Sequence, residues 1–229
     1  MGICLHSGSE TGLQSPLNYI IWGAKGHGMV VRDVLDSYGC HLLAVFDNNT
    51  NLEPPFPDVP LLYLRDGFKK WLSSQDMPSP LGFVVAMGGA RGKDRLRTAG
   101  FLTSYGLQPV SFIHPWTSVC SNVVIGDGVQ IMAGVCISTR VRIGDQTIVN
   151  HMANVDHECI LGKGVHIAPG ATLAGCVTVQ DHVMIGAGAT VLPNLTIEED
   201  VIVGAGAVVT KDVDAGSVVI GVPARRKFQ

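Results

Sequence analysis

The chain has 229 residues and a formal net charge of −3, and charged residues make up only 15% of it. Its length is enough for two small domains. The mean hydropathy of +0.30 is high, yet no run of about 18 apolar residues marks a membrane span. The slightly acidic balance, without a basic segment rich in aromatic residues, argues against nucleic acid as the main partner. We therefore expect a cytoplasmic protein that neither inserts into a membrane nor binds nucleic acid.

Residues 1–17 lack both the basic start and the apolar stretch of a secretory signal, so we expect them to form a flexible leader. The six cysteines are irregularly spaced. Irregular spacing and the lack of an export signal make a disulfide framework improbable.

Residues 18–113 predict a Rossmann-like domain of alternating strands and helices. Residues 18–22 have the pattern of a buried strand, a glycine-rich turn follows at 23–28, and a helix is expected over 29–38. A second strand at 41–46 ends at Asp47-Asn48. This order is typical of a nucleotide-binding unit. However, the glycines follow G-x-x-G-x-G and not the dinucleotide fingerprint, and a simple tight turn would explain them equally well.

The remainder of this first domain continues the alternation. Helices are expected at 64–73 and 93–105, and strands at 81–87 and 109–113. A proline-rich loop covers 53–60. A domain of this size has room for one nucleotide.

From Val119 to Val209, every sixth residue is Val, Ile or Leu, and the residues four positions later are apolar or small. A period of six fits neither an amphipathic helix nor an alternating strand. It indicates the parallel β-helix of hexapeptide-repeat proteins. We therefore expect a left-handed β-helix of about five coils, three hexads to a coil, in a domain that covers residues 114–229.

Polar residues cluster in the middle of this repeat, at Asn150, His151, Asp156, His157, Glu158 and His166. A repeat of this kind needs only its inward residues for stability, so the cluster suggests a function. Carboxylates flank His157, and a carboxylate beside a histidine raises its basicity and fixes its tautomer, as a general base requires. An ordinary ion pair on the surface is the alternative that the residues alone leave open.

A zinc site is the chemical rival of a general base, because three histidines and a water form hydrolytic zinc centres. Carbonic anhydrases with a parallel β-helix use a His-x4-His pair. The histidines at 151, 157, 166 and 182 do not have that spacing. We expect no metal.

Four motifs together resemble one family. They are Ile21-Trp22-Gly23-Ala24-Lys25-Gly26-His27-Gly28, Phe46-Asp47-Asn48, the segment from Asn150 through Asp156-His157-Glu158-Cys159, and Gly221-Val222-Pro223-Ala224-Arg225. Over residues 18–229 the chain resembles the bacterial sugar-nucleotide N-acetyltransferases of the bacillosamine and perosamine pathways, with the sialic acid O-acetyltransferases as cousins.

The resemblance implies a homotrimer with active sites between neighbouring β-helices and acetyl-CoA as co-substrate. The implied acceptor is the 4-amino group of a nucleotide-linked 4-amino-4,6-dideoxysugar, with UDP ahead of dTDP and GDP. The product would serve the synthesis of surface glycans such as the O-antigen of lipopolysaccharide.

The resemblance also implies residue roles. His157 matches the general base, Glu158 its orienting carboxylate, and Gly175 the glycine whose N–H faces the thioester oxygen. The other matches are Lys25, Gly26, His27, Asp47 and Asn48 in the nucleotide-sugar pocket, Asn150 near the sugar, His166 near the acetyl thioester, and Ala187, Gly204, Ala205 and Arg225 along coenzyme A.

Three alternatives keep the same fold. The acceptor could be a sugar hydroxyl, as in sialic acid O-acetylation, or the acyl group could differ from acetyl. The third alternative is a non-catalytic trimeric scaffold that binds a nucleotide.

Overall fold

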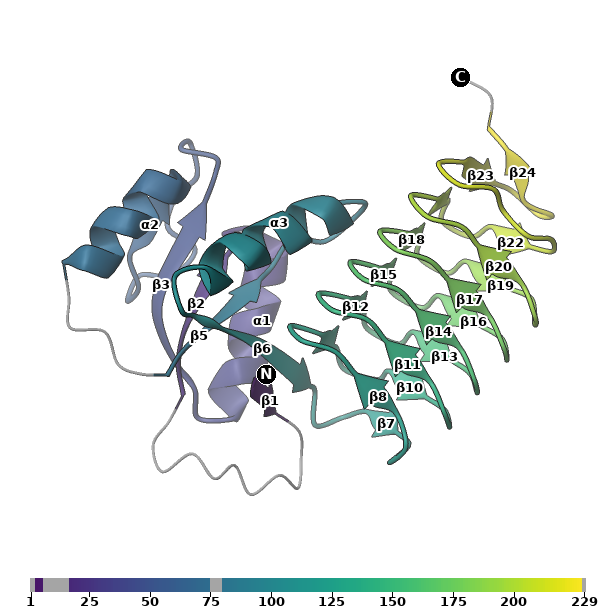
Figure 1. Ribbon diagram of the computed structural model, residues 1–229, viewed down its shortest axis with the longest axis horizontal. Helices are drawn as coiled ribbons and strands as arrows, with labels where there is room; N and C mark the ends of the chain where they lie inside the picture. Colours follow the sequence, from purple (N-terminus) through teal and green to yellow (C-terminus); the bar gives the residue numbers. More distant parts are fainter. Residues whose placement is uncertain (1–2, 6–16, 75–79, 228–229) are drawn as a thin grey trace.

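The computed structural model describes residues 3–5, 17–74 and 80–227. An α/β domain comes first, and a β-helix extends away from it (Figure 1). This arrangement confirms the predicted fold of a Rossmann-like domain followed by a left-handed parallel β-helix.

The first domain is built on parallel strands. They are β2 (Asn18–Trp22), β3 (His41–Asp47), β4 (Leu61–Tyr63), β5 (Leu81–Val85) and β6 (Gln108–Ile113), in the spatial order β4-β3-β2-β5-β6. The chain moves from β2 through β3 to β4 and then returns to place β5 on the other side of β2. A reversal of this kind leaves a crevice at the carboxyl ends of the strands, where α/β domains bind their ligands.

Helices cover both faces of this sheet. Helix α1 (Gly26–Ser37) packs on one face, together with Tyr19 and Ile21 of β2. Helices α2 (Leu64–Ser73) and α3 (Gly92–Thr103) pack on the other face, together with Ile20 and Trp22. Successive side chains of a strand point to opposite faces, so a strand that is covered on both faces must be apolar throughout.

The predicted helices and strands of this domain are present, with ends that differ by a few residues. The sequence missed β4, whose three residues are too few to show a pattern. The flexible leader was also expected to include residues 3–5, and there the expectation is wrong. Ile3–Leu5 form strand β1, parallel to β6, and the side chain of Leu5 is buried in the core. Residues 1–2 and 6–16 lie outside the described residues.

The β-helix has three flat sides, each a ladder of two-residue strands. The six-strand sheet contains β7 (Ser118–Val119), β10 (Cys136–Ile137), β13 (Asn154–Val155), β16 (Thr172–Leu173), β19 (Thr190–Val191) and β22 (Val208–Val209). The five-strand sheet contains β8 (Val124–Ile125), β11 (Arg142–Ile143), β14 (Ile160–Leu161), β17 (Thr178–Val179) and β20 (Thr196–Ile197).

The third side is continuous with the first domain. It contains β9 (Gln130–Ile131), β12 (Ile148–Val149), β15 (His166–Ile167), β18 (Met184–Ile185) and β21 (Ile202–Val203). Strand β9 pairs with β6, so the sheet of the α/β domain runs directly into this side, here named the joined sheet. The pairing of β6 with β9 therefore fixes the position of the first domain relative to the coils of the β-helix.

The second residue of each short strand is the hexad position that the sequence predicted to point inward. From Ile131 to Val209 these residues lie in one continuous core, and the two that precede them, Val119 and Ile125, are only partly buried. Strands β23 (Val218–Ile220) and β24 (Arg225–Arg226) form an antiparallel pair beyond the last coil. None of the helices in the described part of the chain is long and apolar enough to cross a membrane.

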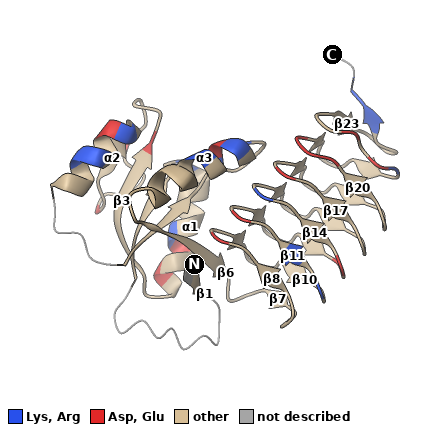
Figure 2. Ribbon diagram, in the orientation of Figure 1, with Lys and Arg blue, Asp and Glu red and all other residues tan. Residues whose placement is uncertain are grey.

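Charged side chains lie mostly on the helices and at the corners of the coils (Figure 2). Arg142 is the one charged residue among the outward positions of the strands β7 to β22, all of which the structure describes. The flat sides of the β-helix are therefore nearly neutral.

Candidate functional site

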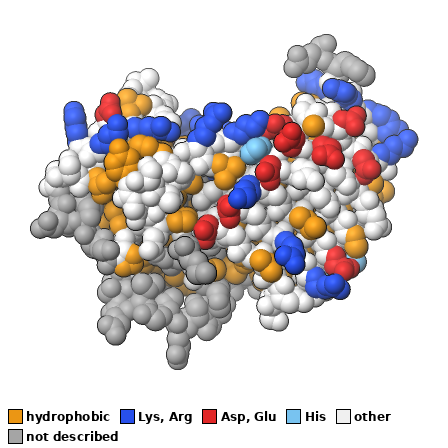
Figure 3. Space-filling view, viewed as in Figure 1, with side chains coloured by type: hydrophobic (Ala, Val, Ile, Leu, Met, Phe, Trp, Pro, Cys, Tyr) orange, Lys and Arg blue, Asp and Glu red, His pale blue; other side chains and the backbone are white. Residues whose placement is uncertain are grey.

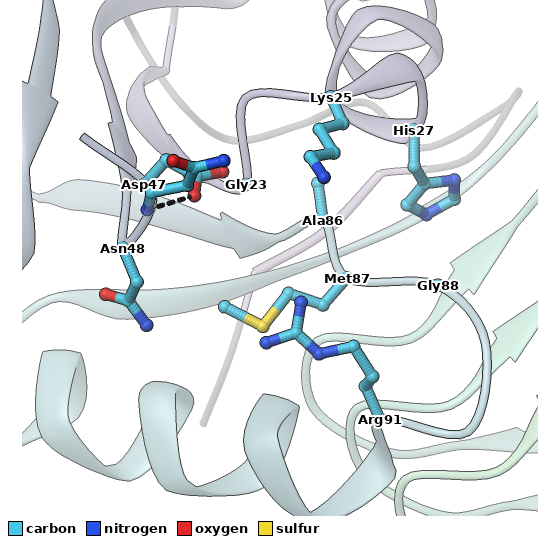
Figure 4. A pocket seen from close by; sticks show the side chains of 10 residues that line it. Gly23, Lys25, His27, Asp47, Asn48, Ala86, Met87, Gly88 and Arg91 are labelled. Carbon is cyan, nitrogen blue, oxygen red and sulfur yellow. Dashed lines mark hydrogen bonds between the residues drawn. The ribbon is translucent and has the colours of Figure 1, made fainter. Parts of the chain in front are cut away.

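A cavity of about 420 Å³ lies at the carboxyl ends of β2, β3 and β5, where the strand order reverses (Figure 4). It is lined by Gly23, Lys25, His27, Asp47, Asn48, Asn49, Ala86, Met87, Gly88 and Arg91. Four of the five residues predicted for a nucleotide-sugar pocket are among them: Lys25, His27, Asp47 and Asn48. The fifth, Gly26, is the first residue of α1 and has open space where a Cβ would stand.

Two glycines allow the turn before α1 to pass close to β5. Gly23 has a φ of 122°, and a Cβ on it would lie 2.4 Å from the carbonyl oxygen of Ala86. A Cβ on Gly28 would lie 2.3 Å from the carbonyl oxygen of Gly23. Both positions therefore require glycine for close approach of the backbone.

Asp47 holds two of the pocket loops together. Its carboxylate accepts hydrogen bonds from the backbone N–H of Ala24 and the backbone N–H of Asn49, each at 2.8 Å. The first bond ties the turn after β2 to the end of β3. Asp47 therefore lies where the sequence predicted a pocket residue, and it orders the loops of that pocket.

Two cations reach into this cavity from different loops. Figure 4 shows Lys25 and Arg91 extending toward one another across it. Arg91 also pairs with Asp94 at 3.1 Å. A cavity with two cations suits a phosphate-bearing ligand. Sequence reasoning missed Arg91; the available signal was the Gly88-Gly89 pair directly after the strand expected at 81–87.

The ring of His27 is fixed by Gln130, a fully buried residue of β9. Gln130 donates from its amide nitrogen to the carbonyl oxygen of Val85 (2.9 Å), so its own oxygen faces Nε2 of His27 (2.8 Å). Nε2 of His27 therefore carries the hydrogen. Burial is the main cause that lowers the pKa of His27 below its usual value.

A second group, on the joined sheet, consists of His166 and Asn150. The backbone N–H of Gly89 donates to Nδ1 of His166 at 2.7 Å. The hydrogen of the neutral ring therefore lies on Nε2. Burial, with the nearby charges of Arg95 and His27, lowers the pKa of His166 to about 4. The ring is therefore neutral at pH 7.

Asn150 places a second donor beside this ring. Its side-chain oxygen accepts the backbone N–H of His151 at 2.8 Å, which turns its amide nitrogen toward Nε2 of His166 at 3.2 Å. Both atoms carry hydrogen, so neither can accept from the other. Two N–H donors therefore lie side by side, ready for an oxygen of a bound molecule.

The third group lies at a coil corner after β13. Nδ1 of His157 is 3.4 Å from the Glu158 carboxylate, which also pairs with Arg140 at 3.2 Å. This contact leaves Nε2 as the ring atom that can take a proton. A Cβ on Gly175 would lie 2.4 Å from that Nε2, so the imidazole sits directly over the glycine. The N–H of Gly175 donates to no atom among the described residues.

Cys176 is a further neighbour of this pair. Its sulfur lies 4.0 Å from Nδ1 of His157 and 3.9 Å from the carboxylate of Glu158. The three side chains offer metal-ligand atoms within 4.8 Å of one another. Arg140 already neutralises Glu158 and would repel a cation. The geometry therefore favours the use of His157 and Glu158 as a proton-transfer pair.

The residues predicted to contact coenzyme A lie toward the other end of the β-helix. Ala187 and Ala205 occupy successive coils at the corner after the joined sheet, one and two coils beyond Pro169. A Cβ on Gly204 would lie 2.7 Å from the side chain of Ile220. Arg225 is exposed in β24, and Figure 3 shows lysine and arginine side chains gathered at this C-terminal end.

The three groups do not meet within one chain. The corner that carries His157 lies between the six-strand and five-strand sheets, whereas His166 and the first domain lie on the joined sheet. In a three-sided coil, a corner between two sides lies opposite the third side. His157 therefore faces away from the cavity of its own chain.

Comparison with known proteins places this arrangement in a family. A family model described as bacterial transferase hexapeptide (six repeats) matches residues 176–211. The GDP-perosamine N-acetyltransferase of Escherichia coli O157:H7 is 40% identical over 105 residues, which are 46% of this chain and 47% of that protein. Matches to the curated relatives thus span about half of their length.

The solved structures match over nearly the whole chain. PerB from Caulobacter crescentus, in complex with CoA and GDP-perosamine, is 34% identical with a TM-score of 0.82, over 92% of this chain and 97% of PerB. The chain belongs to the hexapeptide-repeat sugar-nucleotide N-acetyltransferases. The acetyltransferase domain of PglB from Neisseria gonorrhoeae, in complex with acetyl coenzyme A, is 28% identical with a TM-score of 0.81, over 93% of this chain and 100% of that domain.

The candidate site residues that the sequence predicted lie in three groups, and the residues that connect these groups were not predicted. Arg91, Gln130 and the buried Arg95 were not predicted. Gln130 and Arg95 are polar residues at otherwise ordinary positions, and only their contacts with distant backbone reveal them.

Proposed function

We propose that this protein transfers the acetyl group of acetyl-CoA to the 4-amino group of a nucleotide-linked 4-amino-4,6-dideoxysugar. The observation that carries the proposal is the His157–Glu158 pair seated over Gly175. A carboxylate holds one ring nitrogen of His157. Among the described residues, the other ring nitrogen has no hydrogen-bond partner and the backbone N–H of Gly175 beside it donates to no atom.

His157 acts as the general base in this reaction. The amine nitrogen attacks the thioester carbon, and Nε2 of His157 takes the proton that the nitrogen loses. The C–S bond then breaks, and the departing sulfur of coenzyme A takes a proton from the imidazolium. Glu158 stabilises that imidazolium through Nδ1. General base catalysis of this kind contributes on the order of 10²–10⁴-fold.

The tetrahedral intermediate places negative charge on the former carbonyl oxygen. The N–H of Gly175 is a donor close to His157, and such a donor is worth about 3 kcal/mol to the transition state. His166 and Asn150 supply two further donors on the joined sheet, for oxygens of the sugar and of the acetyl thioester. Ala187, Gly204, Ala205 and Arg225 form the proposed path of coenzyme A.

The cavity at the end of β2 takes the nucleotide. Lys25 and Arg91 contact the diphosphate, and the Asp47–Asn48 segment contacts the base. PerB has been seen with GDP-perosamine. We therefore place GDP first among the nucleotides, although the family resemblance had favoured UDP, and dTDP is the third alternative.

The active enzyme is a homotrimer in this proposal. Within one chain His157 faces away from the cavity, so base and acceptor pocket must come from neighbouring chains. The nearly neutral sides of the β-helix suit contact between copies, because few charges lose water there. The product then serves the synthesis of surface glycans.

The test is release of coenzyme A from acetyl-CoA with GDP-, UDP- and dTDP-linked 4-amino-4,6-dideoxysugars offered in parallel. An enzyme-only blank corrects for the six cysteines when a thiol reagent reports release. We expect fast release with one nucleotide. In His157→Ala we expect a loss on the order of 10²–10⁴-fold with nearly unchanged affinity for acetyl-CoA.

Turnover close to wild type in His157→Ala would refute the role of the base. Release with a hydroxyl acceptor and none with the amines would support the sugar O-acetyltransferase instead. Activity only with another acyl-CoA would change the donor. If no donor and acceptor pair released coenzyme A, the nucleotide-binding scaffold would be the remaining explanation.

A further inference from the structure

Arg95 of helix α3 is completely buried and donates four hydrogen bonds to backbone carbonyl oxygens. Nη1 donates to Met87 at 2.7 Å, Nε to Gln146 at 2.9 Å, and Nη2 to Gly164 and Val165 at 2.6 and 3.0 Å. No carboxylate pairs with it among the described residues. All hydrogen bonds of the Arg95 guanidinium within the described residues therefore go to backbone carbonyl oxygens.

The carbonyls that Arg95 holds belong to both domains. Met87 lies in the loop between β5 and α3, residues 86–91, which lines the nucleotide cavity with Ala86, Met87, Gly88 and Arg91. The other three carbonyls belong to the β-helix. Gly89 of the same loop donates to His166. Two neighbouring points of the cavity loop are therefore fastened to the β-helix.

The backbone is packed closely at this junction. A Cβ on Gly92 would lie 2.3 Å from the carbonyl oxygen of Gly164, so the first turn of α3 rests directly on a coil corner. Arg95 enters the β-helix one helical turn later. The contact between the cavity loop and the joined sheet has little freedom while Arg95 is in place.

The geometry demands an arginine. Burial lowers the pKa of Arg95 to about 10, so the group is still charged at neutral pH. Burying a cation without an anionic partner is costly, and here four carbonyl dipoles offset that cost. The planar fork of arginine has five donors in fixed directions, whereas lysine has a single point charge on a flexible stem. Lysine cannot hold four carbonyls in two domains at once.

We propose that Arg95 is a positioning residue for acetyl transfer, which sets the distance between the nucleotide cavity and the His166–Asn150 donors. This inference rests on the proposed function, in which the sugar spans from the cavity to those donors. The nucleotide is held on one domain and the reacting end of the sugar on the other. A shift of about 1 Å between them costs on the order of 10²-fold in rate.

The kinetic test compares Arg95→Lys and Arg95→Gln with Arg97→Gln, an exposed arginine on the same helix. For both Arg95 variants we expect a higher KM for the nucleotide sugar and a lower kcat, about 100-fold in kcat/KM together. The KM for acetyl-CoA stays within about twofold, because Arg95 makes no hydrogen bond to Ala187, Gly204, Ala205 or Arg225, the proposed path of coenzyme A. Arg97→Gln keeps wild-type values.

Hydrogen exchange provides a readout that does not depend on turnover. In Arg95→Gln, and in Arg95→Lys should Arg95→Gln not fold, the amides of residues 86–91 exchange faster than in wild type. Exchange in β3 and α2 is unchanged. If no acceptor is acetylated by the wild type, the proposed function fails, and this exchange still decides the role of Arg95.

Two results would overturn the proposal. One is a folded Arg95 variant with a lower melting temperature but wild-type kinetics and wild-type exchange at residues 86–91, which would make Arg95 a purely structural residue. The other is an equal rise in both KM values, which would indicate general loosening of the protein.

Discussion

At the scale of single residues, the position of the proposed base His157 requires glycine at position 175, because a side chain there would collide with the imidazole. In Gly175→Ala the new Cβ would lie 2.4 Å from Nε2 of His157 and must displace the imidazole. We expect kcat to fall on the order of 10²-fold, because a reacting group moved by about 1 Å loses its alignment.

The control for this change is Gly100→Ala on helix α3, where a Cβ meets nothing within 4 Å. It should retain full activity. Wild-type kcat in Gly175→Ala would show that the imidazole can sit elsewhere without loss, and it would argue against the placement of the base.

A second residue-scale prediction concerns pH. The pKa of His166 is lowered from 6.5 to about 4 in the folded protein. Between these values the unfolded chain binds the extra proton, so the free energy of unfolding falls as the pH is lowered through this range. Above pH 6.5 the stability contributed by His166 is fully present. Below pH 4 it is lost, and the free energy of unfolding differs by about 3 kcal/mol between these two limits.

Melting curves at pH 7 and pH 5 test this. The wild type should lose melting temperature at pH 5, and His166→Gln should lose less. Some dependence will persist, because burial also lowers the pKa of His27. His41→Gln, on the exposed start of β3, serves as control. Equal slopes in His166→Gln and wild type would contradict the assignment.

At the scale of elements, the start of α1 decides whether the proposed nucleotide cavity can form. Gly26 and Gly28 are two residues apart, yet a Cβ on Gly26 meets open space and one on Gly28 lies 2.3 Å from a carbonyl oxygen. We expect Gly28→Ala to cost about 2 kcal/mol of stability through forced displacement of the helix. Gly26→Ala stays within about 0.5 kcal/mol. Urea unfolding of the two variants measures these losses of stability. Equal losses in Gly26→Ala and Gly28→Ala would contradict the close approach of Gly28 to the carbonyl oxygen of Gly23.

The elements differ in how far the sequence predicted them. The hexads were readable because each coil repeats the same inward positions. Strand β4 has three residues, and β1 has three residues apart from the rest of the sheet. Neither is long enough for alternation to show. Their pairing with distant strands, rather than local preference, makes them strands.

At the scale of the whole molecule, the separation of His157 from its own cavity predicts complementation between chains. We expect His157→Ala and Asp47→Ala each to inactivate the proposed homotrimer, the first by removing the proposed base and the second by releasing the loops of the cavity. Co-expressed in equal amounts, they should form mixed trimers in which about a third of the sites have both parts intact.

The measurement is coenzyme A release by purified mixed trimers, with each single variant as control. Light scattering should give a mass of three chains of 24.2 kDa. Mixed trimers without activity would mean that base and pocket work within one chain.

The sequence by itself determined the two domains, the family and most of the proposed catalytic and binding residues. This was possible because hexad burial and the short motifs depend on neighbours a few positions away. The tertiary structure alone decided how these residues meet. His27 reaches Gln130 across 103 positions, Gly89 reaches His166 across 77, and Arg95 reaches Gln146 across 51. No local pattern marks such a contact, because it depends on where the joined sheet and α3 bring the chain back upon itself.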